Sequence, residues 1–180
     1  MSDATGNPKA KVFFALWPTA AERDRLAAWQ KPLQRLCGGR AMRSEMLHNT
    51  LVFIGNVEQA RLEALQLAAQ EVSGQRFELC FDAAHYWKHN HIVYAAPGEI
   101  PQQLAQLVDA LEQRLSVHGF NFDPRQYKPH VTLLRNARWT GAALPKMKLA
   151  CWQAADFALV QSAQQQGEPH YRVLARFPLG

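Results

Sequence analysis

The spacing of apolar residues along the chain predicts an irregular mixture of strands and helices. Short apolar or alternating runs indicate strands, because successive side chains of a strand point to opposite faces of its sheet. Apolar residues that recur every three or four positions indicate helices, whose buried face repeats at that interval. Strands are expected at residues 12–17, 47–54, 77–82, 92–96, 129–134, 157–160 and 171–177, and helices at 20–36, 57–72 and 101–119.

Capping and turn residues mark the ends of the first helix. Thr19, followed three residues later by Glu22, matches the capping box that begins many helices. Gly38–Gly39 follows the last apolar position of the same helix and is typical of a helix end. Because residues 1–10 are small and polar, we expect them to form a flexible terminus and residues 11–180 to form one domain.

The order of these elements indicates the fold class. Strands 77–82 and 92–96 follow one another with no helix between them, as do strands 157–160 and 171–177. Strands that are neighbours in this way are typical of antiparallel hairpins, whereas a doubly wound sheet alternates strand and helix throughout. The sequence therefore predicts an α+β fold.

Composition adds a basic surface to this picture. Hydrophobic residues make up 48% of the 180 residues, which is enough for a core and argues against disorder. The formal net charge of +5 favours a polyanionic partner such as nucleic acid. No apolar run approaches the ~18 residues that a membrane span needs, so we expect no contact with a membrane.

The cysteines indicate a compartment. Cys37, Cys80 and Cys151 are odd in number, far apart and without a Cys-x-x-Cys pair. This pattern predicts neither a disulfide framework nor a zinc ribbon. The first residues also lack the apolar core of a signal peptide, and we therefore expect a cytoplasmic protein.

A short motif occurs twice, once in each half of the chain. Leu47–Leu51 reads Leu-His-Asn-Thr-Leu, and Pro129–Leu133 reads Pro-His-Val-Thr-Leu. Alternation along a strand places the His and Thr of each copy on one face. Two such strands brought together would direct two imidazoles and two hydroxyls into one cleft, which predicts His48 and His130 as catalytic residues with Thr50 and Thr132 beside them.

These side chains suit acid–base chemistry on a phosphodiester. An imidazole titrates near neutral pH, so one histidine can donate a proton while the other accepts one. A cyclic phosphodiester needs a base to activate water and an acid to protonate the departing ribose oxygen. The threonine hydroxyls can bind phosphate oxygens, so the arrangement requires neither a metal ion nor another cofactor.

The doubled His-x-Thr-Leu, the continuation of its second copy to Arg135, and Phe13–Leu16 near the start resemble the 2H phosphoesterase superfamily. Within it the chain is most similar to the bacterial RNA 2′,3′-cyclic phosphodiesterases, also called 2′-5′ RNA ligases. The resemblance implies two pseudo-symmetric lobes, each an antiparallel sheet flanked by helices, with the site in a central cleft. Residues 11–180 would then form a single bilobal domain.

The resemblance also implies a reaction and roles. The first histidine, His48, would protonate the leaving 3′ oxygen, and His130 would activate water, which leaves a 2′-phosphate. Thr50 and Thr132 would bind the phosphate. Joining of a cyclic end to a 5′-hydroxyl without ATP would be the reverse reaction. The implied partner is RNA with 2′,3′-cyclic phosphate ends, with tRNA halves as one candidate, acted on by a monomer.

Two residues of the motifs depart from simple expectation. Asn49 is polar where an apolar residue packed behind the sheet is expected. Arg135 matches an arginine often found after the second motif and would be a natural phosphate ligand. Strict alternation nevertheless places Arg135 opposite His130, so it can reach the site only where the strand ends or bulges.

Aromatic and histidine clusters offer further candidates. Phe13, Phe14, Tyr86 and Trp87 could stack on a nucleobase, although at least one of the two phenylalanines is expected in the core. We assign Phe14 to substrate binding on this basis. The histidines between residues 85 and 91 lack the Cys, Asp or Glu partners of a metal site, so an exposed turn is expected there.

Two other functions stay open on the sequence alone. The same residues could act on a small cyclic nucleotide or a 2′-5′ oligoadenylate. The scaffold could also be an RNA-binding module without catalysis, although a binder has no need for two proton-transfer groups.

Overall fold

The computed structural model describes residues 6–180. Of the expected flexible terminus, residues 1–5 lie outside the described part, and Lys9 and Ala10 already belong to the first strand. The elements are β1 (Lys9–Leu16), α1 (Ala20–Cys37), β2 (Arg40–Ala41), η1 (Ser44–Met46), β3 (Asn49–Glu58), η2 (Gln59–Arg61), α2 (Leu62–Gln70), β4 (Phe77–Phe81), β5 (Ala83–Trp87), β6 (Ile92–Ala96), α3 (Gln102–Val117), β7 (Val131–Arg135), β8 (Ala150–Ala154), β9 (Asp156–Gln165) and β10 (Glu168–Pro178).

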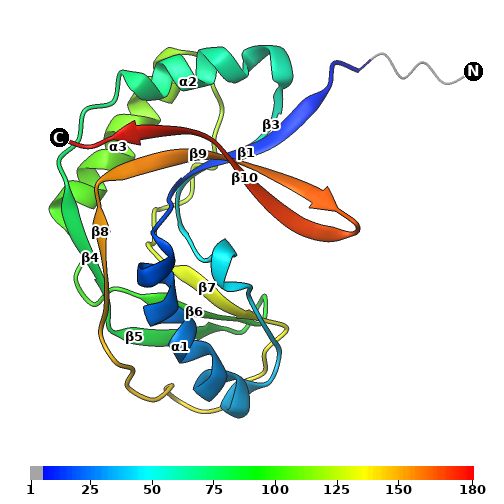
Figure 1. Ribbon diagram of the computed structural model, residues 1–180, viewed down its shortest axis with the longest axis vertical. Helices are drawn as coiled ribbons and strands as arrows, with labels where there is room; N and C mark the ends of the chain where they lie inside the picture. Colours follow the sequence, from blue (N-terminus) through cyan, green and yellow to red (C-terminus); the bar gives the residue numbers. More distant parts are fainter. Residues whose placement is uncertain (1–5) are drawn as a thin grey trace, which may run out of the picture.

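Two four-stranded sheets and one two-stranded ribbon form the framework of the molecule (Figure 1). The first sheet has the order β10-β9-β1-β3, the second has β2-β7-β6-β5, and β4 pairs with β8 in the ribbon. Every one of these strand pairs is antiparallel. The expected α+β class with antiparallel sheets is confirmed.

The helices cover the two sheets in a crossed order. α1 follows a strand of the first sheet but packs against β7 and β8, whereas α3 follows β6 of the second sheet and packs against α2 and β3. In Figure 1, α2 and α3 accordingly lie beside the first sheet and α1 beside the second, with β4 and β8 running between the two halves. The chain thus crosses between the halves several times, and both halves share one continuous core.

Alternation along β1 explains how the first sheet separates two environments. Val12, Phe14 and Leu16 point into the main core. Phe13 and Ala15 point to the opposite face, where they pack in a smaller cluster. That second face of the sheet turns toward the second half of the molecule and forms part of the site described below.

The first helix begins and ends where the sequence predicts. Thr19 accepts a hydrogen bond from the Glu22 backbone amide, and the Glu22 carboxylate accepts one from the Thr19 amide. Gly38, with φ of 63°, ends the helix in a conformation that favours glycine. The buried side of α1 carries Leu26, Trp29 and Leu33, as the apolar period predicts.

The expected helix 57–72 is too long at its start. β3 continues through Gly55, whose φ of 87° suits glycine, and ends only at Glu58, which pairs with Lys9. α2 therefore spans only Leu62–Gln70. The strands β2, β5 and β8 were not predicted, because β2 has only two residues and neither β5 nor β8 contains Val, Ile or Leu. The turn expected at residues 85–91 is therefore shorter, since β5 continues to Trp87.

The expectation that the cysteines form no disulfide is wrong for one pair. Cys80 on β4 and Cys151 on β8 lie directly opposite each other and are joined by a disulfide bond. Their separation of 71 residues in sequence conceals this pairing, since nothing in the sequence shows that the two strands are neighbours. Cys37 is buried and free. Among the described residues, the structure has no helix both long and apolar enough to cross a membrane.

Candidate active site

A pocket of about 750 Å³ lies between the two sheets. The first sheet contributes residues of β1, β3, β9 and β10 to its wall, and the second contributes residues of β5, β6 and β7. The segment 123–128 forms a further part of the rim. Of the six residues predicted for the site, five line this pocket: His48, Thr50, His130, Thr132 and Arg135.

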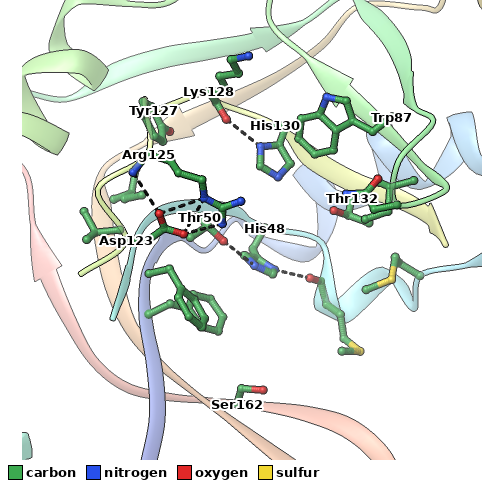
Figure 2. Close-up of a pocket in the computed structure, with 18 of the residues that line it drawn as sticks. His48, Thr50, Trp87, Asp123, Arg125, Tyr127, Lys128, His130, Thr132 and Ser162 are labelled. Atoms are coloured by element: carbon green, nitrogen blue, oxygen red, sulfur yellow. Dashed lines mark hydrogen bonds and ion pairs between the residues drawn. The ribbon is translucent and has the colours of Figure 1, made fainter. Parts of the chain in front are cut away.

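The two histidines are held in the same way on opposite walls (Figure 2). His48 Nδ1 lies 2.7 Å from the Met46 carbonyl oxygen, and His130 Nδ1 lies 2.7 Å from the Lys128 carbonyl oxygen. A carbonyl oxygen can only accept, so Nδ1 carries a proton in both rings and donates it. This leaves Nε2 of each ring as the atom that can gain or lose a proton.

The threonine of the first motif contacts its histidine. Thr50 Oγ1 lies 3.1 Å from His48 Nε2, so its hydroxyl can donate to the neutral ring. This contact confirms that the two side chains share a face, as alternation predicts. Thr132 lines the same pocket from β7.

Aromatic rings enclose His48 on both faces. Its ring stacks with Phe13 at 5.0 Å and with Trp17 at 5.3 Å, and the edge of Tyr171 lies 5.2 Å away. The Arg23 guanidinium carbon lies over the Trp17 ring, 5.0 Å from its centroid. The sequence placed Trp17 at the end of the first predicted strand without a role in the site, although it continues the alternation of Phe13.

His130 has a different aromatic environment. Its ring meets Trp87 at a centroid distance of 4.7 Å and Tyr94 at 5.8 Å, both nearly perpendicular. Trp87 and Tyr94 project from β5 and β6 of the second sheet, where their own rings lie 3.9 Å apart. The second histidine is therefore held by ring edges and faces at right angles, and it is not stacked between two rings as His48 is.

Burial lowers the pKa of both histidines. For His48 the pKa falls to about 4, chiefly through burial, while the Met46 carbonyl acts in the opposite direction. The positive charges of His130, Arg23 and Arg135 lower it further. Burial also lowers the pKa of His130, against the raising effect of the Lys128 carbonyl. Both rings are therefore held toward the neutral form in the ligand-free protein.

A bulge brings Arg135 into the pocket. Tyr94 pairs with Thr132 but the preceding residue, Val93, pairs with Leu134, so Leu133 has no partner on β6. One unpaired residue shifts the alternation by one position, and Arg135 then faces the same side as Thr132. Strict alternation placed Arg135 opposite His130, and this bulge is what allows it to reach the site.

The first motif has the same irregularity. Ala15 pairs with Thr50 and Phe14 with Val52, which leaves Leu51 unpaired, and the pairing of Phe13 with Phe53 follows. Phe53 therefore lines the pocket at the position that corresponds to Arg135 in the second motif. It was missed by the sequence analysis, although superposing the two motifs around Arg135 would have indicated it.

The assignment of Phe14 to substrate binding is wrong. Phe14 is fully buried and packs against Phe157 and Phe177 on the core side of the first sheet. Its neighbour Phe13 faces the pocket instead. Both residues lie in one strand, and only the pairing of β1 with β3 and β9 decides which of the two faces outward.

The aromatic and histidine residues after β4 divide between two faces. Trp87 and His89 line the pocket. Tyr86 points to the other face, where its hydroxyl donates to the Ala137 carbonyl oxygen. His91 lies 2.9 Å from that same hydroxyl, outside the pocket. Within residues 6–180 the one group of side chains close enough to share a metal ion is Glu78 with the disulfide-bonded Cys80 and Cys151.

Charged side chains give the pocket an excess of basic groups. Lys11, Lys128 and Arg135 line it as cations, and Glu112 lines it as an acid. The Asp123 carboxylate at the rim is already occupied by the Arg125 guanidinium, with Asp123 Oδ2 and Arg125 Nε 2.9 Å apart. The walls therefore favour an anion.

Comparison with known proteins agrees with this geometry. The family model described as the 2′-5′ RNA ligase superfamily matches residues 17–166. An RNA 2′,3′-cyclic phosphodiesterase of Escherichia coli is 28% identical over 169 residues, which cover 94% of this chain and 96% of that protein. An RNA 2′,3′-cyclic phosphodiesterase of Archaeoglobus fulgidus is 26% identical over 131 residues, 71% of this chain and 73% of its own.

Solved structures agree as well. The crystal structure of E. coli LigT complexed with 3′-AMP has a TM-score of 0.85 and 27% identity, and the match covers 96% of this chain and 99% of LigT. LigT complexed with phosphate has a TM-score of 0.80 at 27% identity, with coverage of 95% and 98%. The fold, the paired motifs and the match over most of the sequence agree, and the chain belongs to the 2′-5′ RNA ligase superfamily.

Proposed function

We propose that this protein hydrolyses 2′,3′-cyclic phosphate ends of RNA to 2′-phosphates, with His48 as the general acid and His130 as the general base. The observation that carries the proposal is the pair of imidazoles, each of which donates a hydrogen bond from Nδ1 to a carbonyl oxygen and keeps Nε2 as the nitrogen that can gain or lose a proton. Two sequence relatives bear the name of this activity. The basic pocket walls suit an anionic substrate.

The reaction needs two proton transfers on opposite sides of one phosphorus. His130 Nε2 takes a proton from water, and the oxygen of that water forms a bond to phosphorus. The bond from phosphorus to the 3′ oxygen breaks as His48 Nε2 gives its proton to that oxygen. Each transfer contributes typically ~10²–10⁴ in rate. The product carries a 2′-phosphate and a 3′-hydroxyl, and the two histidines have exchanged protonation states.

Three side chains are suited to hold the phosphate between the histidines. The Thr50 and Thr132 hydroxyls can donate to its unesterified oxygens, and the Arg135 guanidinium can bind it through two parallel hydrogen bonds. All three reach the pocket from the two motif strands. Positioning and charge neutralisation therefore come from the strands that directly follow the two histidines.

The acid role requires that His48 gain a proton when substrate binds. With a pKa of about 4 the ring is neutral at pH 7 in the free protein. A phosphate anion beside Nε2 favours the charged ring and raises that pKa, and the stacked faces of Phe13 and Trp17 also attract a cation. Substrate binding and proton uptake are thus coupled.

The terminal nucleobase has an aromatic surface available at the pocket mouth. Phe53 lines the pocket and is 38% exposed, and Trp87 lines the opposite side. Stacking of one base on such a ring contributes ~1–3 kcal/mol. A 5′-hydroxyl end can take the place of water as the nucleophile: its oxygen bonds to phosphorus as the bond to the 3′ oxygen breaks, which gives 2′-5′ ligation without ATP. The proposal includes a cytoplasmic monomer that uses no metal or other cofactor, with tRNA halves as one candidate substrate.

The direct test is incubation with a short RNA that ends in a 2′,3′-cyclic phosphate, followed by separation of 2′- and 3′-phosphate products. We expect the 2′-phosphate, at a rate unchanged by EDTA. His48→Ala and His130→Ala should each abolish turnover. A suitable control is His118→Ala, since His118 makes a surface hydrogen bond with Glu71 away from the pocket. Full turnover by either active-site variant would overturn the mechanism.

Two outcomes would redirect the assignment. Turnover of 2′-5′ oligoadenylate or a small cyclic nucleotide in preference to RNA ends would change the substrate but keep the chemistry. Tight RNA binding with unchanged RNA ends would indicate a binding module.

A further inference from the structure

Asn49, the residue between His48 and Thr50, is fully buried in the structure. Among the described residues, only Asn49 and Gln30 are polar and buried. Burial of an amide is costly unless it forms hydrogen bonds. Asn49 Oδ1 accepts one from the Tyr127 hydroxyl at 3.2 Å, whereas its Nδ2 has no partner among the described residues.

The Asn49–Tyr127 hydrogen bond connects the two motifs. Asn49 belongs to β3 of the first sheet, and Tyr127 precedes the strand that carries the second motif. Tyr127 directly precedes Lys128, whose carbonyl oxygen accepts a hydrogen bond from His130 Nδ1. The hydrogen bond therefore joins Asn49, which follows His48, to Tyr127, which precedes the residue that holds His130.

The contact differs from the apolar packing between the two halves, and it is supported by a backbone hydrogen bond that the Asp123 amide donates to the Phe53 carbonyl oxygen. The shared core is apolar, and apolar contacts have little directional preference. Gln30, the other buried polar side chain, bonds the Met42 and Leu133 carbonyl oxygens beside the second sheet and does not reach the first. A buried hydrogen bond fixes both distance and angle, and it is stronger at low dielectric than in water.

We infer that Asn49 and Tyr127 are a positioning pair that fixes the position of His48 relative to His130. Acid and base must lie on opposite sides of one phosphorus, and a displacement of about 1 Å can cost ~10²-fold in rate. The inference deepens the proposed function and rests on it. Burial also raises the pKa of Tyr127, so its hydroxyl stays protonated and able to donate across the working pH range.

The test begins with Tyr127→Phe, which removes the hydroxyl and keeps the ring. We expect kcat on an RNA 2′,3′-cyclic phosphate to fall ~10- to 100-fold with KM within about twofold, because the substrate contacts remain. Tyr86→Phe is the matched control. It removes a phenol hydroxyl that bonds the Ala137 carbonyl oxygen on the face of the second sheet away from the pocket. Its kcat should equal that of the wild type.

A second variant separates positioning from stability. Asn49→Leu with Tyr127→Phe replaces both polar partners with apolar groups, so no buried polar atom is left unpaired and unfolding stability should return toward the wild type. We expect kcat to stay low in this double variant. Recovery of kcat together with stability would overturn the inference, as would a Tyr127→Phe enzyme within twofold of wild-type kcat.

A readout without substrate keeps this test independent of the proposed function. Imidazole NMR titration of the ligand-free protein should show the pKa values of His48 and His130 moving in Tyr127→Phe and unchanged in Tyr86→Phe. Unmoved values in Tyr127→Phe would overturn the inference. A wild-type protein that fails to open RNA cyclic ends would instead overturn the proposed function, while the titration would still decide the role of the pair.

Discussion

At the scale of single residues, His48 and His130 share a hydrogen-bonding pattern but not a surrounding. His48 is stacked between two rings and lies near two arginines, whereas His130 meets its aromatic neighbours at right angles. A positive charge on the His48 ring therefore costs more free energy in the ligand-free protein than a positive charge on the His130 ring. A bound anion also stabilises protonated His48 more, because the anion offsets the positive charges that oppose protonation.

This difference predicts a measurable proton uptake. Addition of inorganic phosphate should raise the pKa of His48 from about 4 toward neutrality. By linkage, phosphate should bind more tightly as pH falls toward that value, since the protonated ring binds the anion better. Histidine NMR titration with and without phosphate measures both effects. A His48 pKa that is the same in the two titrations would contradict the acid role.

The lowered pKa of His48 also predicts that the protein loses stability in acid. Because the folded-state pKa of His48 is below the unfolded value near 6.5, the unfolded chain binds more protons between those pH values. Unfolding free energy should therefore decrease as pH falls from about 6.5 to about 4. Denaturant unfolding at several pH values measures this, and His48→Gln should flatten the decrease. If the unfolding free energy of His48→Gln decreased with pH as steeply as that of the wild type, groups other than His48 would cause the decrease.

Arg135 should act mainly in binding the phosphate. Its loss removes a hydrogen bond to a charged group, worth ~1.5–3 kcal/mol, which corresponds to ~10- to 150-fold in kcat/KM. Arg135→Ala should show this loss in steady-state kinetics. Arg172→Ala is the control, because Arg172 on β10 is exposed and adjoins Tyr171, which lines the pocket. Equal activity of the two variants would exclude the arginine from the site.

Two phenylalanines of the paired strands β1 and β3 should separate stability from binding. Phe14→Ala should lower the unfolding free energy by ~3–5 kcal/mol, because it opens a cavity in the core. Phe53→Ala should leave stability nearly unchanged and raise KM for RNA ends, since Phe53 is partly exposed at the pocket. Urea unfolding and steady-state kinetics on both variants measure these effects. A Phe53→Ala enzyme with wild-type KM would remove the stacking role.

At the scale of elements, the sequence predicted what depends on local periodicity. The buried faces of α1 and α3 follow from apolar spacing, and Thr19 with Glu22 predicted the start of α1. The pairing of His48 with Thr50 follows from alternation alone. The bulges at Leu51 and Leu133 depend on the partner strand, so periodicity could not reveal them or the inward turn of Arg135.

The β4–β8 ribbon gives a prediction of its own. Its disulfide closes a loop across a separation of 71 residues, and the chain-entropy model gives about 4 kcal/mol of stabilisation for a loop of this size. A reductant, or Cys80→Ser with Cys151→Ser, should lower the unfolding free energy by up to this amount. Thermal unfolding with and without reductant measures it. The serine variant should show no further response to reductant, and identical melting of oxidised and reduced wild type would contradict the prediction.

At the scale of the whole molecule, the arrangement of the halves was beyond local reasoning. α1 covers the sheet to which its preceding strand does not belong, and the shared core includes residues from both halves. Only the resemblance to a known superfamily predicted two sheets around a central cleft. The contact of Asn49 with Tyr127 explains the polar residue that seemed out of place in the first motif.

The order of strands in the first sheet has a consequence for synthesis. β1 leaves the ribosome long before β9, yet Lys11–Ala15 of β1 pairs with β9. Before β9 is made, β3 alone can pair with β1, and the opposite edge of β1 stays open until β9 emerges. The pocket wall beside His48 is therefore complete only after β9 and β10 have emerged. A nascent chain interrupted before β9 would present an exposed apolar edge of β1 and would lack the residues that β9 and β10 contribute to the pocket.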